Sequence, residues 1–223
     1  MKKEAYVPEI IPENDVNIMM EKYRGGFRGG FGSKIAVLIV DMTHAFVDDQ
    51  YRTGYSKTGK PALKAIKRLL DRARDLKVPI FFTRAAPSYS KVERGRWFGK
   101  VRPLSGPRPP ESDEIVDELK PMEGEFIILK TKPSAFFGTP LESLLTYLNV
   151  DSLIITGMVT SGCVRATVMD AFSYNYRVNI PLECVADRSQ ISHEVTLFDL
   201  DMKYADVTPL SKVLDRLDKL GGN

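Results

Sequence analysis

A cysteine, a lysine and an aspartate each follow a short apolar run in this sequence, and together they could activate a thiol. Asp41 and Lys130 come directly after such runs, and Cys163 follows the run at 152–157 after a short polar turn. A thiol with a pKa of about 8.5 becomes a useful nucleophile when a cation and a helix N-terminus stabilise its thiolate. A carboxylate can accept the thiol proton and later donate it to a leaving amine. The three residues therefore predict nucleophilic chemistry.

Each of these residues also has a simpler structural interpretation. An Asp at a strand end commonly caps a helix or binds a metal, a Lys there is commonly solvated, and a lone Cys is commonly a small buried apolar residue. Asp187 and Arg188 follow a further run, where they could form a surface ion pair. Ligands of open α/β sheets bind beyond the carboxyl ends of the strands, so the gathering of these groups at strand ends favours the catalytic interpretation.

The apolar runs alternate with segments of helical period, which is typical of a parallel sheet covered by helices on both faces. One apolar stripe extends from Ala62 to Leu76 and another from Val164 to Phe172. We therefore predict an α/β fold, a three-layer α-β-α sandwich around a central parallel six-stranded sheet of Rossmann-like type. The expected strands lie at 34–41, 78–84, 125–130, 152–157, 177–187 and 206–210, and further helical periods lie at 112–119, 139–148, 192–205 and 211–220.

Length and composition indicate one domain. A chain of 223 residues with 43% hydrophobic content can bury a full core, and we expect that domain at 34–223, after an N-terminal arm at 1–33. Two cysteines and the lack of an apolar leader indicate a reducing cytoplasm, and Cys184, within an apolar run, is predicted to be a core residue. No apolar run is long enough to span a membrane. The net charge of +3 is small, so composition gives little support for nucleic-acid binding.

Two regions differ from the alternating pattern. The arm ends in YRGGFRGGFG, whose glycines predict a flexible segment. This string resembles an RGG element that contacts RNA, but it is short, and a contact between subunits is the favoured interpretation. The connection at 84–112 contains seven basic residues against Glu93 and Glu111, so it could attract an anionic substrate. Trp97, within it, could line the pocket or a subunit interface.

Five strings of this sequence carry a family resemblance: LIVDMTHAF, LKTKPSAFFGT, LIITGMVTSGCVRATVMDAF, VADR and DLDMKYADV. Together they resemble the isochorismatase-like cysteine hydrolases, particularly the N-carbamoylsarcosine amidase branch. The resemblance implies the isochorismatase-like hydrolase fold and a catalytic triad of Asp41, Lys130 and Cys163. Lys132 lies near the lysine position, but the four-residue step to Ser134 in the family string selects Lys130.

The resemblance also implies how a substrate is bound. It places a cis peptide between Met158 and Val159, beside Thr160, so that the N–H groups of Val159 and Cys163 face the substrate oxygen. Arg188 matches the position that binds a substrate carboxylate. The implied reaction is attack of the Cys163 sulfur on the carbonyl carbon of a small carbamoyl or amide compound, with release of ammonia.

Some expectations follow from what the sequence lacks. Related nicotinamidases bind a metal through one Asp and two His, whereas this chain has only His44 and His193, and no Asp-x-His string follows the second strand. We therefore expect neither a metal nor another cofactor. The resemblance implies a homo-oligomer, specifically a tetramer. Two alternatives remain: an amidase for maleamate, nicotinamide or another small amide, and an inactive scaffold, against which the complete triad argues.

Overall fold

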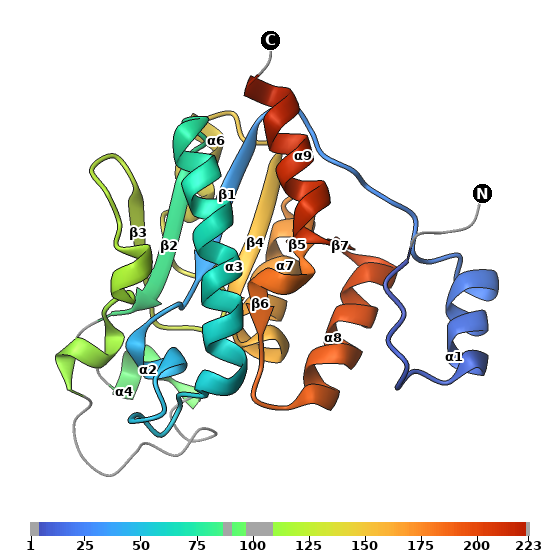
Figure 1. Cartoon of the computed structure of the whole chain (residues 1–223), viewed down its shortest axis with the longest axis horizontal. Helices are drawn as coiled ribbons and strands as arrows, with labels where there is room; N and C mark the ends of the chain where they lie inside the picture. Colours follow the sequence, from blue (N-terminus) through green and yellow to red (C-terminus); the bar gives the residue numbers. More distant parts are fainter. Residues whose placement is uncertain (1–4, 87–90, 97–108, 222–223) are drawn as a thin grey trace.

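The computed structural model describes residues 5–86, 91–96 and 109–221, and a parallel sheet forms its centre (Figure 1). The strand order is β3-β2-β1-β4-β5-β7, and the short β6 pairs with β4. Each recorded strand pair is parallel. The strands are β1 Ile35–Val40, β2 Ile80–Ala85, β3 Phe126–Lys130, β4 Ser152–Met158, β5 Arg177–Pro181, β6 Val185–Ala186 and β7 Asp206–Thr208.

The two central strands, β1 and β4, are buried along their whole length. Strands covered on both faces require continuous apolar sequence rather than alternation, as in the run IAVLIV of β1. Val37 of β1 pairs with Ile80 on one side and Ile154 on the other. This register aligns the carboxyl ends of the central strands, where Asp41 and the turn after Met158 begin.

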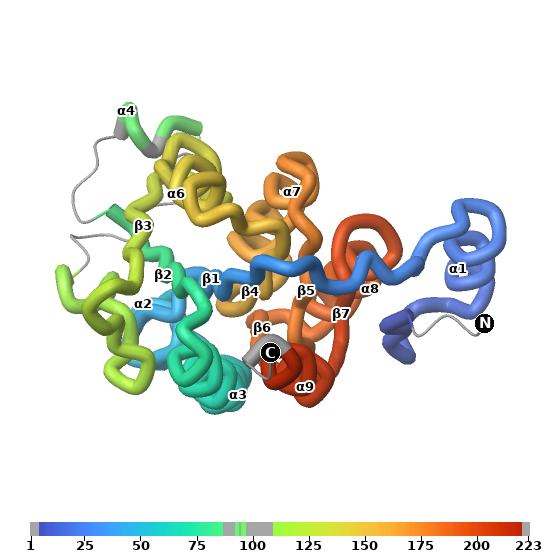
Figure 2. Tube along the Cα trace, turned by 90° about the horizontal axis from the view of Figure 1, so that it is seen from above, coloured from blue at the N-terminus to red at the C-terminus, as the bar shows by residue number. Residues whose placement is uncertain are grey.

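Helices cover both faces of the sheet (Figure 2). One apolar cluster joins the sheet to α3 and α9, and a second joins the opposite face to α6, α7 and α8. None of the described helices is long and apolar enough to cross a bilayer. The α-helices are α1 Glu13–Asn17, α2 His44–Val47, α3 Ser56–Asp75, α4 Lys91–Arg94, α6 Leu141–Tyr147, α7 Arg165–Ser173, α8 Gln190–Lys203 and α9 Leu210–Gly221; the π-helical turns are η1 Ile18–Lys22 and η4 Thr160–Val164; and the 3-10 turns are η2 Pro110–Asp113, η3 Asp117–Leu119 and η5 Leu182–Cys184.

The predicted three-layer fold with a parallel sheet is confirmed, with two local differences. The expected strand at 177–187 is divided: β5 ends at Pro181, a 3-10 turn follows, and β6 pairs with β4 rather than continuing beside β7. Proline removes a backbone donor, so the ladder is interrupted there.

The helix expected at 112–119 was wrong. Glu114 is extended, and Ile115 forms an isolated antiparallel bridge with Thr43. The N–H of Val116 donates to the carbonyl of Met42 at 3.1 Å. This pairing with the segment after β1 replaces the helical hydrogen bonds that the apolar spacing predicted.

The glycine-rich part of the N-terminal arm is attached to the domain by backbone hydrogen bonds. The N–H groups of Gly29 and Gly30 donate to the carboxylate of Asp206 at 3.0 and 2.7 Å. Arg28 forms an ion pair with the buried Asp201. The sequence predicts a flexible segment here, but these contacts hold it against β7 and the C-terminal end of α8.

Candidate active site

Asp41, Lys130 and Cys163 meet at the carboxyl edge of the sheet, as the sequence predicts. The Lys130 Nζ atom lies 2.7 Å from Asp41 Oδ2 and 3.5 Å from the Cys163 sulfur. All three residues are buried, with exposed fractions of 4% for Asp41, 4% for Lys130 and 6% for Cys163. The lysine therefore links the carboxylate and the thiol in a site that is largely shielded from solvent.

Lys130 and Asp41 come from strands that are not neighbours. β3, which ends at Lys130, pairs with β2, and β2 separates it from β1. The long lysine side chain spans the end of β2, where Thr83 lies. Cys163 follows β4, which pairs directly with β1. The three residues thus lie at the ends of β1, β3 and β4, and β2 lies between β3 and β1.

Thr83 holds Asp41 from the end of β2. Its hydroxyl donates to Asp41 Oδ1 at 2.6 Å and accepts the backbone N–H of Asp41 at 3.1 Å. Asp41 has a φ of 50°, in the left-handed region, which aspartate tolerates better than most residues. The sequence analysis did not single out Thr83, which lies near the end of β2 but inside the strand, and not directly after an apolar run as Asp41 does.

The turn that carries Cys163 begins with a close approach between β4 and β1. Gly157 has a φ of 112°, and a Cβ atom there would lie 1.9 Å from the carbonyl oxygen of Val40. Only glycine fits this position. The predicted cis peptide between Met158 and Val159 is confirmed, and the π-helical turn from Thr160 to Val164 then leads directly into α7.

Burial is the main influence on the Cys163 thiol. Burial and the negative charge of Asp41 raise the pKa of Cys163 to about 12, while the positive charge of Lys130 opposes them. Asp41 also hydrogen bonds with the thiol. The raised pKa disfavours the thiolate in the resting site, so an adjacent base is needed to remove the thiol proton.

Lys130 is held in its charged form. Burial alone would lower the pKa of Lys130, but the charge of Asp41 and hydrogen bonds to Asp41 and Cys163 raise it overall. Lys130 Nζ also donates to the backbone carbonyl of Lys132 at 3.3 Å, whereas the Lys132 side chain donates to the carbonyl of Glu93. The geometry therefore agrees with the choice of Lys130 rather than Lys132.

Substitution of Lys130 by alanine should slow the alkylation of Cys163 by iodoacetamide. Loss of the positive charge raises the pKa of the thiol further and so decreases the thiolate fraction at a given pH. Removal of one partner of a buried ion pair also costs about 3–5 kcal/mol, so the melting temperature should fall. Lys132→Ala is the matched control and should change neither value. An alkylation rate in Lys130→Ala equal to that of the wild type would contradict the assigned role of this charge.

The predicted substrate-contacting residues lie around the turn that follows Met158. Val159 is partly exposed, whereas Thr160 is buried and its hydroxyl lies 2.9 Å from His193 Nδ1. Burial lowers the pKa of His193, so the ring is neutral at pH 7 and can accept the hydroxyl hydrogen. The Thr160 hydroxyl thus contributes to holding the turn against α8.

Asp187 holds the same turn from the end of β6. Its Oδ2 atom accepts the N–H and the hydroxyl of Ser161, both at 2.7 Å, and its Oδ1 atom accepts the N–H of Arg188. The Arg188 guanidinium donates to the backbone carbonyl of Thr53 and lies 5.5 Å from the centre of the Phe46 ring. Phe46 belongs to α2, which begins shortly after Asp41. The Arg188 side chain is therefore held beside the segment that follows Asp41.

Three further predictions concern the basic connection, a metal site and Cys184. Trp97 and most of the basic connection lie outside the described residues, although Arg84 forms an ion pair with Glu114. Among the described residues, no three or more His, Cys, Asp or Glu side chains are close enough together to hold a metal ion. Cys184 is fully buried, as predicted for a core residue.

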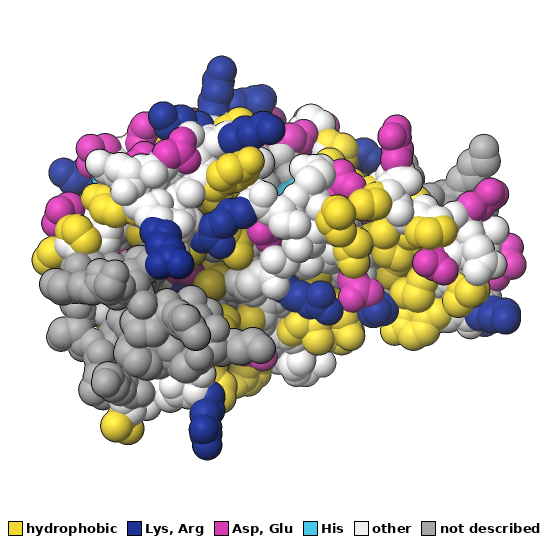
Figure 3. All heavy atoms as spheres, turned by 90° about the horizontal axis from the view of Figure 1, so that it is seen from below, with side chains coloured by type: hydrophobic (Ala, Val, Ile, Leu, Met, Phe, Trp, Pro, Cys, Tyr) yellow, Lys and Arg dark blue, Asp and Glu magenta, His cyan; other side chains and the backbone are white. Residues whose placement is uncertain are grey.

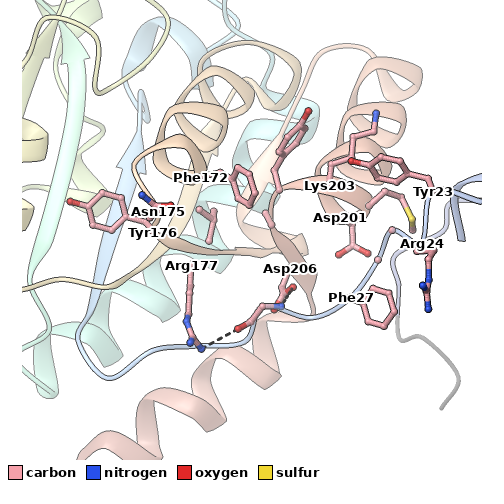
Figure 4. Close-up of a pocket in the computed structure, with 17 residues that line it drawn as sticks. Tyr23, Arg24, Phe27, Phe172, Asn175, Tyr176, Arg177, Asp201, Lys203 and Asp206 are labelled. Atoms are coloured by element: carbon pink, nitrogen blue, oxygen red, sulfur yellow. Dashed lines mark hydrogen bonds between the residues drawn. The ribbon is translucent and has the colours of Figure 1, made fainter.

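A cavity of about 640 Å³ lies away from the triad, between the arm and the domain (Figure 4). Arg177 and Asp206, which line it, begin β5 and β7, so the cavity is at the amino edge of the sheet. Tyr23, Phe27 and Phe172 add aromatic surface to its wall. Since the triad occupies the carboxyl edge, this cavity is separate from the candidate active site.

Comparisons with known proteins agree with the fold. The family description of the isochorismatase domain matches residues 35–211. An N-carbamoylsarcosine amidase from Arthrobacter sp is 34% identical over 200 residues, which cover 86% of this chain and 75% of the relative. A maleamate amidohydrolase from Pseudomonas putida is 32% identical over 230 residues, which cover 94% of this chain and all (100%) of the relative.

A solved isochorismatase family protein from Desulfovibrio vulgaris superposes with a TM-score of 0.73 and 26% identity, covering 84% of this chain and 100% of its own. The parallel sheet and its flanking helices are thus those of an isochorismatase-like hydrolase fold. The chain belongs to the isochorismatase family, which confirms the resemblance found in the sequence.

Proposed function

We propose that this protein is a cysteine-dependent amidohydrolase that releases ammonia from a small carbamoyl or amide compound. The observation that carries the proposal is the buried contact of Lys130 with both Asp41, at 2.7 Å, and Cys163, at 3.5 Å. The similarity to an N-carbamoylsarcosine amidase and a maleamate amidohydrolase supports an amide substrate. A panel of such compounds assayed for ammonia release tests the proposal, and a fully inactive protein would instead favour a scaffold role.

The reaction begins with proton transfer from the thiol to Asp41. As the S–H bond breaks, the Cys163 sulfur forms a bond to the substrate carbonyl carbon, and the carbonyl oxygen becomes an oxyanion. Backbone N–H groups of Val159 and Cys163 would stabilise this oxyanion, as the family resemblance implies. Asp41 then donates its proton to the amine as the C–N bond breaks, and ammonia leaves.

The second half of the reaction uses water. Asp41, again a carboxylate, accepts a proton from a water molecule, whose oxygen attacks the carbon bound to sulfur. The C–S bond breaks and the proton returns to the sulfur. With a carbamoyl substrate the released carbamic acid yields carbon dioxide and the parent amine. Lys130 remains charged throughout, offsetting the negative charge that passes between Asp41 and Cys163.

Two substrate candidates are supported by specific relatives. N-carbamoylsarcosine is favoured by the 34% identity to an N-carbamoylsarcosine amidase. Maleamate is favoured by the similarity to a maleamate amidohydrolase, whose whole length (100%) is covered by the alignment. Both compounds combine a terminal CO–NH₂ group with a carboxylate. We therefore propose a carboxylated substrate, bound through Arg188, as the family resemblance implies for this position.

We further propose a cytoplasmic homo-oligomer, in line with the tetramer implied by the family resemblance. Hydrophobic side chains gather on the face of α8 and the arm (Figure 3), and Ile191, Val195 and Ile18 on these elements are exposed by 62%, 41% and 42%. Such surface is commonly covered in an assembly. Sedimentation velocity measures the mass of the assembly directly, and a monomer at all concentrations would contradict this part of the proposal.

Replacement of Arg188 by leucine should remove a preference for carboxylated substrates. A charge-assisted contact between Arg and a carboxylate contributes about 1.5–3 kcal/mol, so the wild type should prefer the acid over its neutral methyl ester by about ten- to a hundredfold in kcat/KM. Arg188→Leu should hydrolyse both at similar rates. Kinetics on matched acid and ester pairs measure this ratio.

The control for this experiment is Arg72→Leu, which removes an arginine of α3 that pairs with Asp218. That variant should keep the wild-type preference. If the wild type hydrolyses acid and ester equally, Arg188 does not select the substrate, and a neutral amide replaces the two candidates above while the cysteine mechanism stands.

A further inference from the structure

The hydroxyl of Thr167 joins two parts of the candidate active site that are distant in sequence. Thr167 Oγ1 donates to the backbone carbonyl of Cys163 at 2.7 Å and accepts the backbone N–H of Ala135 at 3.0 Å. Thr167 and Ala135 are both completely buried. One side chain therefore bonds the main chain at the nucleophile and the main chain of the segment that follows Lys130.

A second contact, one helical turn further along α7, reinforces the first. Ser134 Oγ donates to Asp170 Oδ2 at 2.5 Å and accepts the N–H of Phe136 at 3.1 Å. Residues three positions apart on a helix lie on the same face, so Thr167 and Asp170 together bind the 134–136 segment to one side of α7.

This attachment bears on Lys130 because the 134–136 segment follows closely after that residue. Lys130 Nζ donates to the carbonyl of Lys132, which lies between Lys130 and the attached segment, and is 3.5 Å from the sulfur. β3 is an edge strand of the sheet, paired only with β2 among the described strands. The hydrogen bonds to α7 therefore link the chain that follows the lysine directly to the helix that follows the cysteine.

We propose that Thr167 is a positioning residue that sets the separation between the Lys130 ammonium and the Cys163 sulfur. The proposal rests on the cysteine mechanism proposed above, and Thr167 itself touches no reacting atom. A Thr or Ser that bonds the carbonyl four residues earlier is common in helices, and Ser173 does the same with Met169 at 2.7 Å. Thr167 differs because it also accepts an N–H from a residue 32 positions away.

The test compares Thr167→Val, which keeps the shape and loses the hydroxyl, with Thr167→Ser, which keeps it. Ser173→Ala is the matched control. It removes the same type of hydrogen bond within α7, but among the described residues no N–H from a distant segment is recorded as donating to the Ser173 hydroxyl. We expect Thr167→Val to lower kcat by about ten- to a hundredfold with little change in KM, because small misplacements of reacting groups have effects of this size. Thr167→Ser and Ser173→Ala should stay near the wild type.

A second readout needs no substrate. Alkylation of Cys163 by iodoacetamide, measured against pH in a Cys184→Ala background, should be slower in Thr167→Val than in the parent. In a Lys130→Ala background the same substitution should have no further effect, because the charge it positions is gone. If Thr167→Val does not fold, Ser134→Ala, which cuts the neighbouring contact, should show the same dependence on Lys130.

The outcomes separate the two proposals. The positioning role would be overturned if Thr167→Val slowed the alkylation of Cys163 equally with and without Lys130. It would also be overturned if Thr167→Val left the pH profile of alkylation unchanged. The wild type could instead release no ammonia from any amide while Thr167→Val still slows the alkylation of Cys163 only when Lys130 is present. That result would refute the proposed function and leave the role of Thr167 intact.

Discussion

Alanine in place of Cys163 is expected to abolish ammonia release while the protein remains folded. The sulfur is the only side-chain atom of this residue that takes part in the proposed mechanism, and alanine keeps the backbone N–H. Removal of a catalytic nucleophile lowers kcat by about 10⁴-fold or more. The substitution removes a single buried atom, so the far-ultraviolet circular dichroism should be unchanged. Ammonia assays on the purified variant, beside its melting curve, measure both.

Cys184→Ala provides the matched control, since Cys184 is also buried but packs in the opposite apolar cluster, on the α3 side of the sheet. It should keep its activity. Rapid-quench mass spectrometry should in addition find an acyl adduct on the peptide that contains Cys163 and none on the peptide that contains Cys184. Ammonia release that persists in Cys163→Ala would eliminate the covalent mechanism.

Asparagine in place of Asp41 should increase the thiolate fraction of Cys163 and yet slow catalysis. Burial is the largest cause of the raised pKa of Cys163, and the Asp41 charge and hydrogen bond raise it further, so a neutral side chain should lower that pKa and increase the thiolate fraction at pH 8. Catalysis should nevertheless fall by about 10²–10⁴-fold, because no base remains to transfer protons to ammonia or from water. Absorbance at the thiolate band against pH, in a Cys184→Ala background, follows the first effect.

The combination of a more reactive thiol and a slower enzyme is specific to a carboxylate that acts as a base. Slower alkylation in Asp41→Asn would show that the carboxylate stabilises the thiolate rather than competing with it. Retention of most of the wild-type kcat/KM would assign the proton transfers to another group.

The sheet and the gathering of the three candidate residues could be predicted because both depend on local sequence. Continuous apolar runs mark strands that are covered on both faces, and in a parallel sheet the residues after those runs necessarily share one edge. Asp41, Lys130 and Cys163 each occupy such a position. Strand order is not encoded in the runs themselves, so the separation of β3 from β1 by β2 is seen only in the structure.

The residues that hold the triad in place could not be found in this way. Thr83 bonds Asp41 across 42 positions, and Thr167 bonds Ala135 across 32 positions. The spacing of a lone threonine gives no sign of its distant partner. For the same reason the segment at 112–119 was expected to be a helix: its apolar period fits one, but hydrogen bonds to Met42 and the bridge to Thr43 exist only after β1 has folded beside it.

The raised pKa of the buried Cys163 thiol bears on the lifetime of the protein under oxidising stress. Hydrogen peroxide reacts with thiolates far faster than with thiols, and the reaction leads through sulfenic to irreversible sulfinic acid. Burial and the Asp41 charge raise the pKa of Cys163 to about 12, and the residue is 6% exposed. In the proposed mechanism the thiolate forms only as a substrate carbonyl receives its electron pair, so we expect the sulfur to react slowly with peroxide when no substrate is bound.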